Sequence, residues 1–159
     1  MKKIIEGESR GDSAIKIAVV VAKFNSEFTE KLLVGAMSRL LEKKVLEENI
    51  TVLKVPGAFE IPMVCKKLVK IEKYDAVIAL GAVIRGDTYH FEVVCDQVAA
   101  GVQNVTIKSG VPVIFGVITT DTEEQAADRT GGKEGNKGSD AADAALEMIS
   151  LIKKIDLND

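Results

Sequence analysis

The chain has 159 residues, of which 47% are hydrophobic and 28% charged, and its formal net charge at pH 7 is −3. This length predicts a single domain over residues 1–159 with a sizeable core. No apolar run is long enough to cross a bilayer, so we expect no membrane association. The acidic balance argues against nucleic acid as a partner. Residues 1–6 lack the apolar stretch of a signal peptide, and we expect a cytoplasmic protein.

The two cysteines carry little functional signal. Cys65 and Cys95 each fall on the apolar face of a predicted helix, beside Leu68 and Val98. We interpret both as buried thiols in a reducing compartment. No cluster of Cys and His has the spacing of a metal site, so we expect no bound metal.

Four apolar runs predict the strands of a parallel sheet: Ile17–Ala22, Ile50–Val55, Ala76–Ile84 and Val113–Thr119. They are rich in Val and Ile and do not alternate cleanly between apolar and polar residues. This pattern is typical of parallel strands that are covered on both faces.

Apolar residues at helical spacing occupy the stretches between these runs. The predicted helices cover about 32–41, 61–68, His90–Ile107, a short segment near Glu123–Asp128, and about Asp140–Ile155. Alternating strands and helices predict an α/β fold of three layers, α/β/α, with a flavodoxin-like, mainly four-stranded parallel sheet. In such sheets, ligands bind beyond the carboxyl ends of the strands. The residues at those ends are therefore the candidates for function.

The ends of the first two strands predict a site for a planar ring. Phe24 follows the first strand and has two interpretations. It is either a hydrophobic staple that packs against the next helix or a flat surface on which a planar ring stacks. From this residue alone, the staple is slightly favoured. The second strand ends in Pro56–Pro62, a rigid corner with two prolines and a glycine. Its backbone amides and Glu60 can pair with a uracil-like ring, although Glu60 can also simply complement the helix dipole.

The end of the third strand predicts an anion site. His90, the single histidine, begins a helix after the turn Gly86–Thr88. Free N–H groups of such a turn bind anions, and imidazole is the side chain that titrates nearest neutral pH. Asp87 would repel a phosphate, so we interpret it as a helix N-cap that is turned aside. Arg85 is near enough to help to bind the anion, but we favour a structural ion pair as its role.

The segment Arg129–Gly138, after the fourth strand, holds four glycines among cations. It does not have the order of residues of a P-loop. The segment suits close backbone approach to an anion, with Arg129 as a planar fork for phosphate. The alternative interpretation is a solvated basic loop between two helices.

Five blocks of the sequence, in order, closely resemble the 6,7-dimethyl-8-ribityllumazine synthase family: Ala22–Asn25, Pro56–Pro62, Leu80–Phe91, Pro112–Gly116 and Glu124–Gly138. The resemblance extends from about Ile4 to Ile152. It implies condensation of 5-amino-6-(D-ribitylamino)uracil with 3,4-dihydroxy-2-butanone 4-phosphate, releasing phosphate and water, as the penultimate step of riboflavin biosynthesis. This chemistry requires no cofactor and no metal.

The resemblance also implies roles for individual residues. His90 is the proton-transfer residue. The aminouracil and its ribityl chain are bound by Phe24, Asn25, Ala58, Phe59, Glu60, Ala82, Val83 and Ile84, together with Phe115 and Lys137. The phosphate substrate is bound by Gly86, Asp87, Thr88 and Arg129. Phe115, Arg129 and Lys137 resemble residues that an adjacent subunit contributes. Asp87 stands where many relatives have a small residue, and Gly132 where a threonine is common.

The resemblance implies a pentamer with its active site between subunits. The short Gly131–Gly138 connection resembles that of family members that form icosahedral capsids of pentamers, and this implies a capsid. So does Lys2–Glu6, a predicted short N-terminal strand within an arm, residues 1–14, that can pair with a neighbour's sheet edge. Whether such a capsid encloses riboflavin synthase as a partner stays an open question. Two other functions also stay open: an archaeal-type riboflavin synthase, and a flavin-binding module without catalysis.

Overall fold

The computed structural model describes residues 1–158 and contains a four-stranded parallel sheet in the order β2-β1-β3-β4. Its strands are β1 (Ile17–Ala22), β2 (Ile50–Val55), β3 (Ala76–Ile84) and β4 (Val113–Thr120). The helices are α1 (Ser26–Glu42), α2 (Ile61–Lys70), α3 (His90–Ser109), α4 (Glu123–Arg129) and α5 (Lys137–Asp156). Two single turns of 3₁₀ helix, Glu47–Asn49 and Ala58–Glu60, precede β2 and α2.

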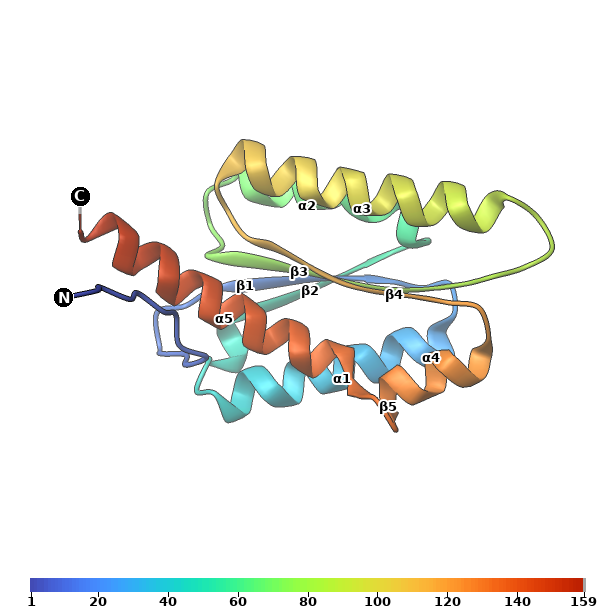
Figure 1. Ribbon diagram of the computed structural model, residues 1–159, viewed down its shortest axis with the longest axis horizontal. Helices are drawn as coiled ribbons and strands as arrows, with labels where there is room; N and C mark the ends of the chain where they lie inside the picture. The colour runs from blue at the N-terminus through green and yellow to red at the C-terminus, as the bar shows by residue number, and fades with distance from the viewer. Residues whose placement is uncertain (159) are drawn as a thin grey trace.

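The helices form two layers, one on each face of the sheet. Helices α2 and α3 cover one face, and α1, α4 and α5 cover the other (Figure 1). Two separate apolar clusters fill the spaces between the layers. Residues of β3 alternate between these clusters: Ile78 and Leu80 belong to one, Val77 and Ala79 to the other. The predicted three-layer α/β/α fold with a flavodoxin-like parallel sheet is confirmed, and β1 is its N-terminal strand.

Strand β2 differs from the prediction that every strand is buried. It lies at one edge of the sheet and is only partly covered, with Val52 38% exposed. The central strands β1 and β3 are buried almost throughout. An edge strand has a single neighbour in the sheet, so its apolar composition alone overstates its burial.

The glycine-rich segment after α4 is more ordered than the predicted loop. Two short antiparallel strands, β5 (Thr130–Gly132) and β6 (Gly135–Asn136), form a hairpin that leads directly into α5. Gly135 adopts a left-handed φ of 73°, which suits the tight turn of the hairpin. Helix α5 consequently begins at Lys137, three residues earlier than predicted.

The N-terminal arm packs along α5 (Figure 1). The Lys154 ammonium donates to the Glu6 carbonyl at 2.8 Å, and the Ser9 hydroxyl donates to Asp143 at 2.6 Å. Lys2–Glu6 is not a strand within the single chain. A strand that pairs with another subunit cannot complete its hydrogen bonds within one chain, so that pairing stays a prediction.

The cysteines differ in their environment. Cys65 is buried, and this burial raises the pKa of its thiol to about 12. Cys95 is only partly buried, so the prediction of two buried thiols is wrong for this residue.

None of the helices within residues 1–158 combines the length and the apolar character needed to cross a membrane.

Helices α1 and α5 approach each other closely through two glycines. A Cβ added at Gly138 would lie 1.9 Å from the Leu32 carbonyl oxygen, and one at Gly35 would lie 2.2 Å from Asn136 Oδ1. The Ser139 hydroxyl donates to the Gly35 carbonyl at 3.1 Å across the same contact. Any side chain at either glycine would separate the two helices.

We therefore expect Gly138→Ala to lower the free energy of unfolding by about 1–3 kcal/mol, because the added methyl group overpacks the contact. Gly86→Ala is the matched control, since a Cβ at Gly86 meets nothing within 4 Å. Denaturant unfolding of both variants measures the difference. Equal stability of the two would contradict the close approach.

Candidate active site

A pocket of about 700 Å³ opens at the carboxyl ends of β1, β2 and β3. It is lined by Phe24, Asn25, Pro56, Gly57, Ala58, Phe59, Glu60, Ala82, Val83, Ile84, Gly86, Thr88, His90, Phe91, Val93 and Val94. All the predicted site residues belong to this lining except Asp87, Phe115, Arg129 and Lys137. The pocket is mostly apolar, with a few polar groups at its mouth, which is typical of a site for a small organic molecule.

The turn after β1 holds Phe24 at the mouth of this pocket. The backbone N–H of Phe24 donates to the Pro56 carbonyl at 3.0 Å. Asn25 has a left-handed φ of 60°, and its side-chain amide donates to the Ala82 carbonyl at 2.8 Å. The turn is thus tied to both neighbouring strands. The ring of Phe24 is 71% exposed, so the interpretation as a buried staple is wrong and the ring is free to stack.

The corner after β2 presents a second exposed ring beside a free carboxylate. Phe59 is 53% exposed, whereas the preceding Ala58 is buried. Glu60 is the N-cap residue of α2, but its side chain makes no capping hydrogen bond. Glu60 also lines the pocket, so its carboxylate is available to a ligand there.

The turn between β3 and α3 brings His90 to the opposite wall. Helix α3 begins at His90, and its N-cap residue, Tyr89, makes no side-chain capping bond. The prediction of Asp87 as N-cap is therefore wrong: Asp87 lies two residues earlier and outside the pocket lining. The Thr88 hydroxyl accepts the His90 N–H at 3.3 Å. Apart from this bond, the start of α3 has no side-chain cap at Tyr89, which keeps its other backbone donors for an anion.

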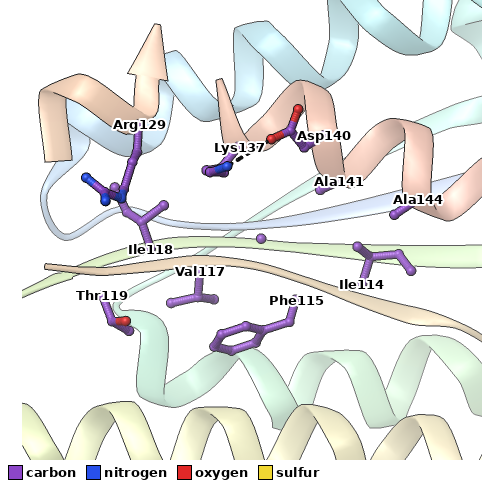
Figure 2. Close-up of a pocket in the computed structure, with 11 residues that line it drawn as sticks. Ile114, Phe115, Val117, Ile118, Thr119, Arg129, Lys137, Asp140, Ala141 and Ala144 are labelled. Atoms are coloured by element: carbon purple, nitrogen blue, oxygen red, sulfur yellow. Dashed lines mark hydrogen bonds and ion pairs between the residues drawn. The ribbon is translucent and has the colours of Figure 1, made fainter. Parts of the chain in front are cut away.

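A second pocket of about 380 Å³ around β4, α4 and α5 is lined by Phe115, Arg129 and Lys137, whereas Asp87 lines neither pocket. Figure 2 shows Phe115 on one side of β4 and Arg129 and Lys137 on the other. The Lys137 ammonium pairs with Asp140 at 3.2 Å, and the Arg129 guanidinium donates to the Gln125 carbonyl at 3.1 Å. No residue lines both pockets. One chain therefore carries the predicted site as two separate halves.

Two capping arrangements hold the cations of the second half. Thr122 and Gln125 form a reciprocal capping box at the start of α4, the helix that ends at Arg129. Asn136 caps α5: its Oδ1 accepts the N–H of Gly138 at 2.8 Å, and its amide donates to the Lys31 carbonyl at 3.0 Å. The sequence analysis missed these residues. The Thr-x-x-Gln spacing in the sequence predicts the capping box at the start of α4. No sequence pattern predicts the hydrogen bond from Asn136 to Lys31 of α1.

The match to known proteins agrees with this geometry. The family model described as 6,7-dimethyl-8-ribityllumazine synthase matches residues 14–153. The chain belongs to this family. Membership makes it a transferase-type enzyme of riboflavin biosynthesis that acts on small molecules and works as a homo-oligomer. Both pockets lie within the matched range, and most of the N-terminal arm lies outside it.

The exposure of Phe24 leads to a stability prediction. Phe24→Ala should leave the free energy of unfolding nearly unchanged, because the ring packs against little of the protein. Phe28→Ala, one turn along α1, should lower it by about 3–5 kcal/mol, since Phe28 is only 4% exposed. Denaturant unfolding of the two variants tests this. A comparable loss in Phe24→Ala would restore the staple interpretation.

Proposed function

We propose that the protein condenses 5-amino-6-(D-ribitylamino)uracil with 3,4-dihydroxy-2-butanone 4-phosphate to give 6,7-dimethyl-8-ribityllumazine, phosphate and water. The observation that carries the proposal is the 700 Å³ pocket, which collects two exposed aromatic rings, a free carboxylate and the histidine at one sheet edge. A planar donor–acceptor ring and a phosphate ester are the two kinds of substrate that such a set of groups accommodates.

The aminouracil occupies the part of the pocket beside β1 and β2. Its ring stacks on Phe24, whose exposed face supplies dispersion without rearrangement of the core. Ala58, Phe59 and Glu60 hold the ribityl chain and the polar edge of the ring. The floor of this subsite is formed by apolar residues at the end of β3, namely Ala82, Val83 and Ile84, with Asn25 beside them.

The phosphate substrate occupies the part beside the start of α3. Backbone donors of the Gly86–Thr88 turn and the Thr88 hydroxyl bind the phosphate. Asp87 does not line the pocket, and we propose that its carboxylate is turned away from the anion. An adjacent subunit contributes Arg129 to this phosphate subsite. The same subunit contributes Phe115 and Lys137 to the aminouracil subsite. A guanidinium group binds phosphate through two parallel hydrogen bonds and stabilises the charge that develops on the leaving group.

His90 moves protons between the two substrates. The 5-amino group of the uracil attacks the ketone, and water leaves to give an imine. Loss of the proton on C3 then expels phosphate from C4 and, after tautomerisation, leaves a carbonyl at C3, and ring closure of the ribitylamino nitrogen onto this carbon releases a second water. Each step transfers a proton to or from nitrogen, oxygen or C3, and imidazole can serve as the acid or base near neutral pH. Positioning the two substrates side by side supplies much of the remaining acceleration.

The separation of the two pockets supports a ring assembly. When identical subunits meet head to tail, the first pocket of one subunit can join the second pocket of its neighbour to form a single site. Head-to-tail contacts of this kind can close into a ring. We propose a pentamer, and a hollow icosahedral capsid of pentamers in which residues 1–14 pair with a neighbour's sheet edge. Electron microscopy of the intact chain tests the capsid, and pentamers alone would contradict it.

The direct test is to supply both substrates and identify the product by mass. We expect 6,7-dimethyl-8-ribityllumazine and inorganic phosphate. Riboflavin from lumazine alone would instead indicate an archaeal-type riboflavin synthase. A flavin that copurifies without turnover would indicate a binding module.

Arg129→Ala should raise the KM for the butanone phosphate by about 10- to 100-fold, because a hydrogen bond to a charged group contributes about 1.5–3 kcal/mol. The KM for the aminouracil should change little. Lys133→Ala is the control, since it removes a cation of the same segment that lines neither pocket. Inorganic phosphate should compete with the butanone phosphate. Competition with the aminouracil instead would reverse the assignment of the two subsites.

Mixed oligomers test whether subunits share the site. His90→Ala and Arg129→Ala alter different pockets. Coexpression in equal amounts should restore about a quarter of the wild-type sites, because a ring joins an intact first half to an intact second half in that fraction of random contacts. Activity of the mixture equal to the mean of the two pure variants would show that each chain completes its own site.

A further inference from the structure

The turn that carries Gly86 and Thr88 receives little support from packing. Residues 85–90 are all exposed. A Cβ at Gly86 would meet nothing within 4 Å. Backbone hydrogen bonds fix the turn only near its ends, where Arg85 N–H donates to the Thr120 carbonyl at 2.9 Å and the N–H of Val93 donates to the Tyr89 carbonyl at 3.2 Å. A site that must hold a phosphate and a histidine in register requires a further restraint here.

The side chain of Arg85 supplies contacts that span this turn. Its Nε donates to the Asp121 carboxylate at 2.8 Å, and its Nη1 pairs with Glu92. Its guanidinium carbon lies 4.3 Å from the centre of the Phe91 ring. One side chain thus joins the end of β3, the first turn of α3 and the loop after β4. Arg85 holds the pKa of the Glu92 carboxyl below its ordinary value, mainly through this hydrogen bond. The predicted structural ion pair of Arg85 is confirmed.

The partners of Arg85 are themselves anchored. The Asp121 N–H donates to the Gln125 side chain at 2.7 Å, next to the capping box of α4. Phe91 lines the pocket beside His90, whereas Arg85 does not line it. Arg85 therefore acts on the site through other residues. Its planar fork can hold two carboxylates and a ring face at once, which the single ammonium of lysine cannot.

We propose that Arg85 is a positioning residue of this enzyme. It holds the first turn of α3 against the loop after β4, and thereby places Thr88 and His90 for the phosphate substrate. The chemical consequence rests on the function proposed above, whereas the restraint itself does not.

The test compares Arg85→Ala and Arg85→Lys with Arg39→Ala in the full-length assembled protein. Arg39 is a matched control because it also bridges two carboxylates, Glu42 and Asp143, away from the pocket. In Arg85→Ala, amide hydrogen exchange over residues 86–95 should accelerate, and in Arg39→Ala it should not. We expect kcat to fall by about 10- to 100-fold in Arg85→Ala. The KM should rise for the butanone phosphate and not for the aminouracil, and Arg85→Lys should recover only part of the loss.

Glu92→Gln tests the route of the effect. Added to Arg85→Ala, it should cause no further loss of kcat, because the interaction is already removed. Unchanged exchange over residues 86–95, or faster exchange with unchanged kcat, would overturn the proposal. Equal increases in KM for both substrates, or additive losses in the double variant, would also overturn it. A wild-type protein that forms no lumazine would refute the proposed function, and the exchange measurement would still decide whether Arg85 restrains the turn.

Discussion

Parallel pairing aligns the ends of the strands, and the pocket depends on this alignment. Ala22 at the end of β1 pairs with Val55 at the end of β2, and Val21 pairs with Leu80 of β3. The turns after β1 and β2 therefore leave the sheet side by side, and β3 continues beyond them to Ile84. This register lets the Phe24 N–H reach the Pro56 carbonyl, and it lets the Asn25 side chain reach the Ala82 carbonyl. A slip of one residue would turn each side chain to the other face of the sheet.

The same sheet explains why the site is divided. Strand β4 ends at the same edge as β3, with Ile84 paired to Thr120. Strand β4 is also the last strand of the sheet, with β3 as its one neighbour. After β4, the chain continues into α4 and α5, which lie on the face of the sheet opposite α2 and α3 (Figure 1). Arg129 is the last residue of α4 and Lys137 the first of α5, so both lie outside the pocket that holds His90. An edge strand with one unpaired side and an exposed Phe115 favours association with another subunit.

Rigidity is distributed unevenly around the site. Backbone hydrogen bonds between neighbouring turns fix the side of the site that carries Phe24. Two helix caps fix the side that carries Arg129 and Lys137. The turn before α3 has neither, and Arg85 joins it to its surroundings through side-chain contacts. A planar ring requires a fixed surface. Under the proposed function, the phosphate meets a turn that is held by exposed ion pairs, which open more readily than a packed core.

Local patterns in the sequence determined the elements of this protein. The runs Ile17–Ala22 and Ala76–Ile84 coincide with β1 and β3, and His90 is the first residue of α3, as predicted. Hydrophobic periodicity and turn residues act over short stretches of chain, so a single sequence reveals them. The family blocks likewise named the residues around the pocket. Tertiary structure decided which of those residues meet: the exposed ring of Phe24, the separation of Arg129 from His90, and the bridge from Arg85 to Asp121. These features depend on which elements lie side by side in space, and no local pattern encodes that.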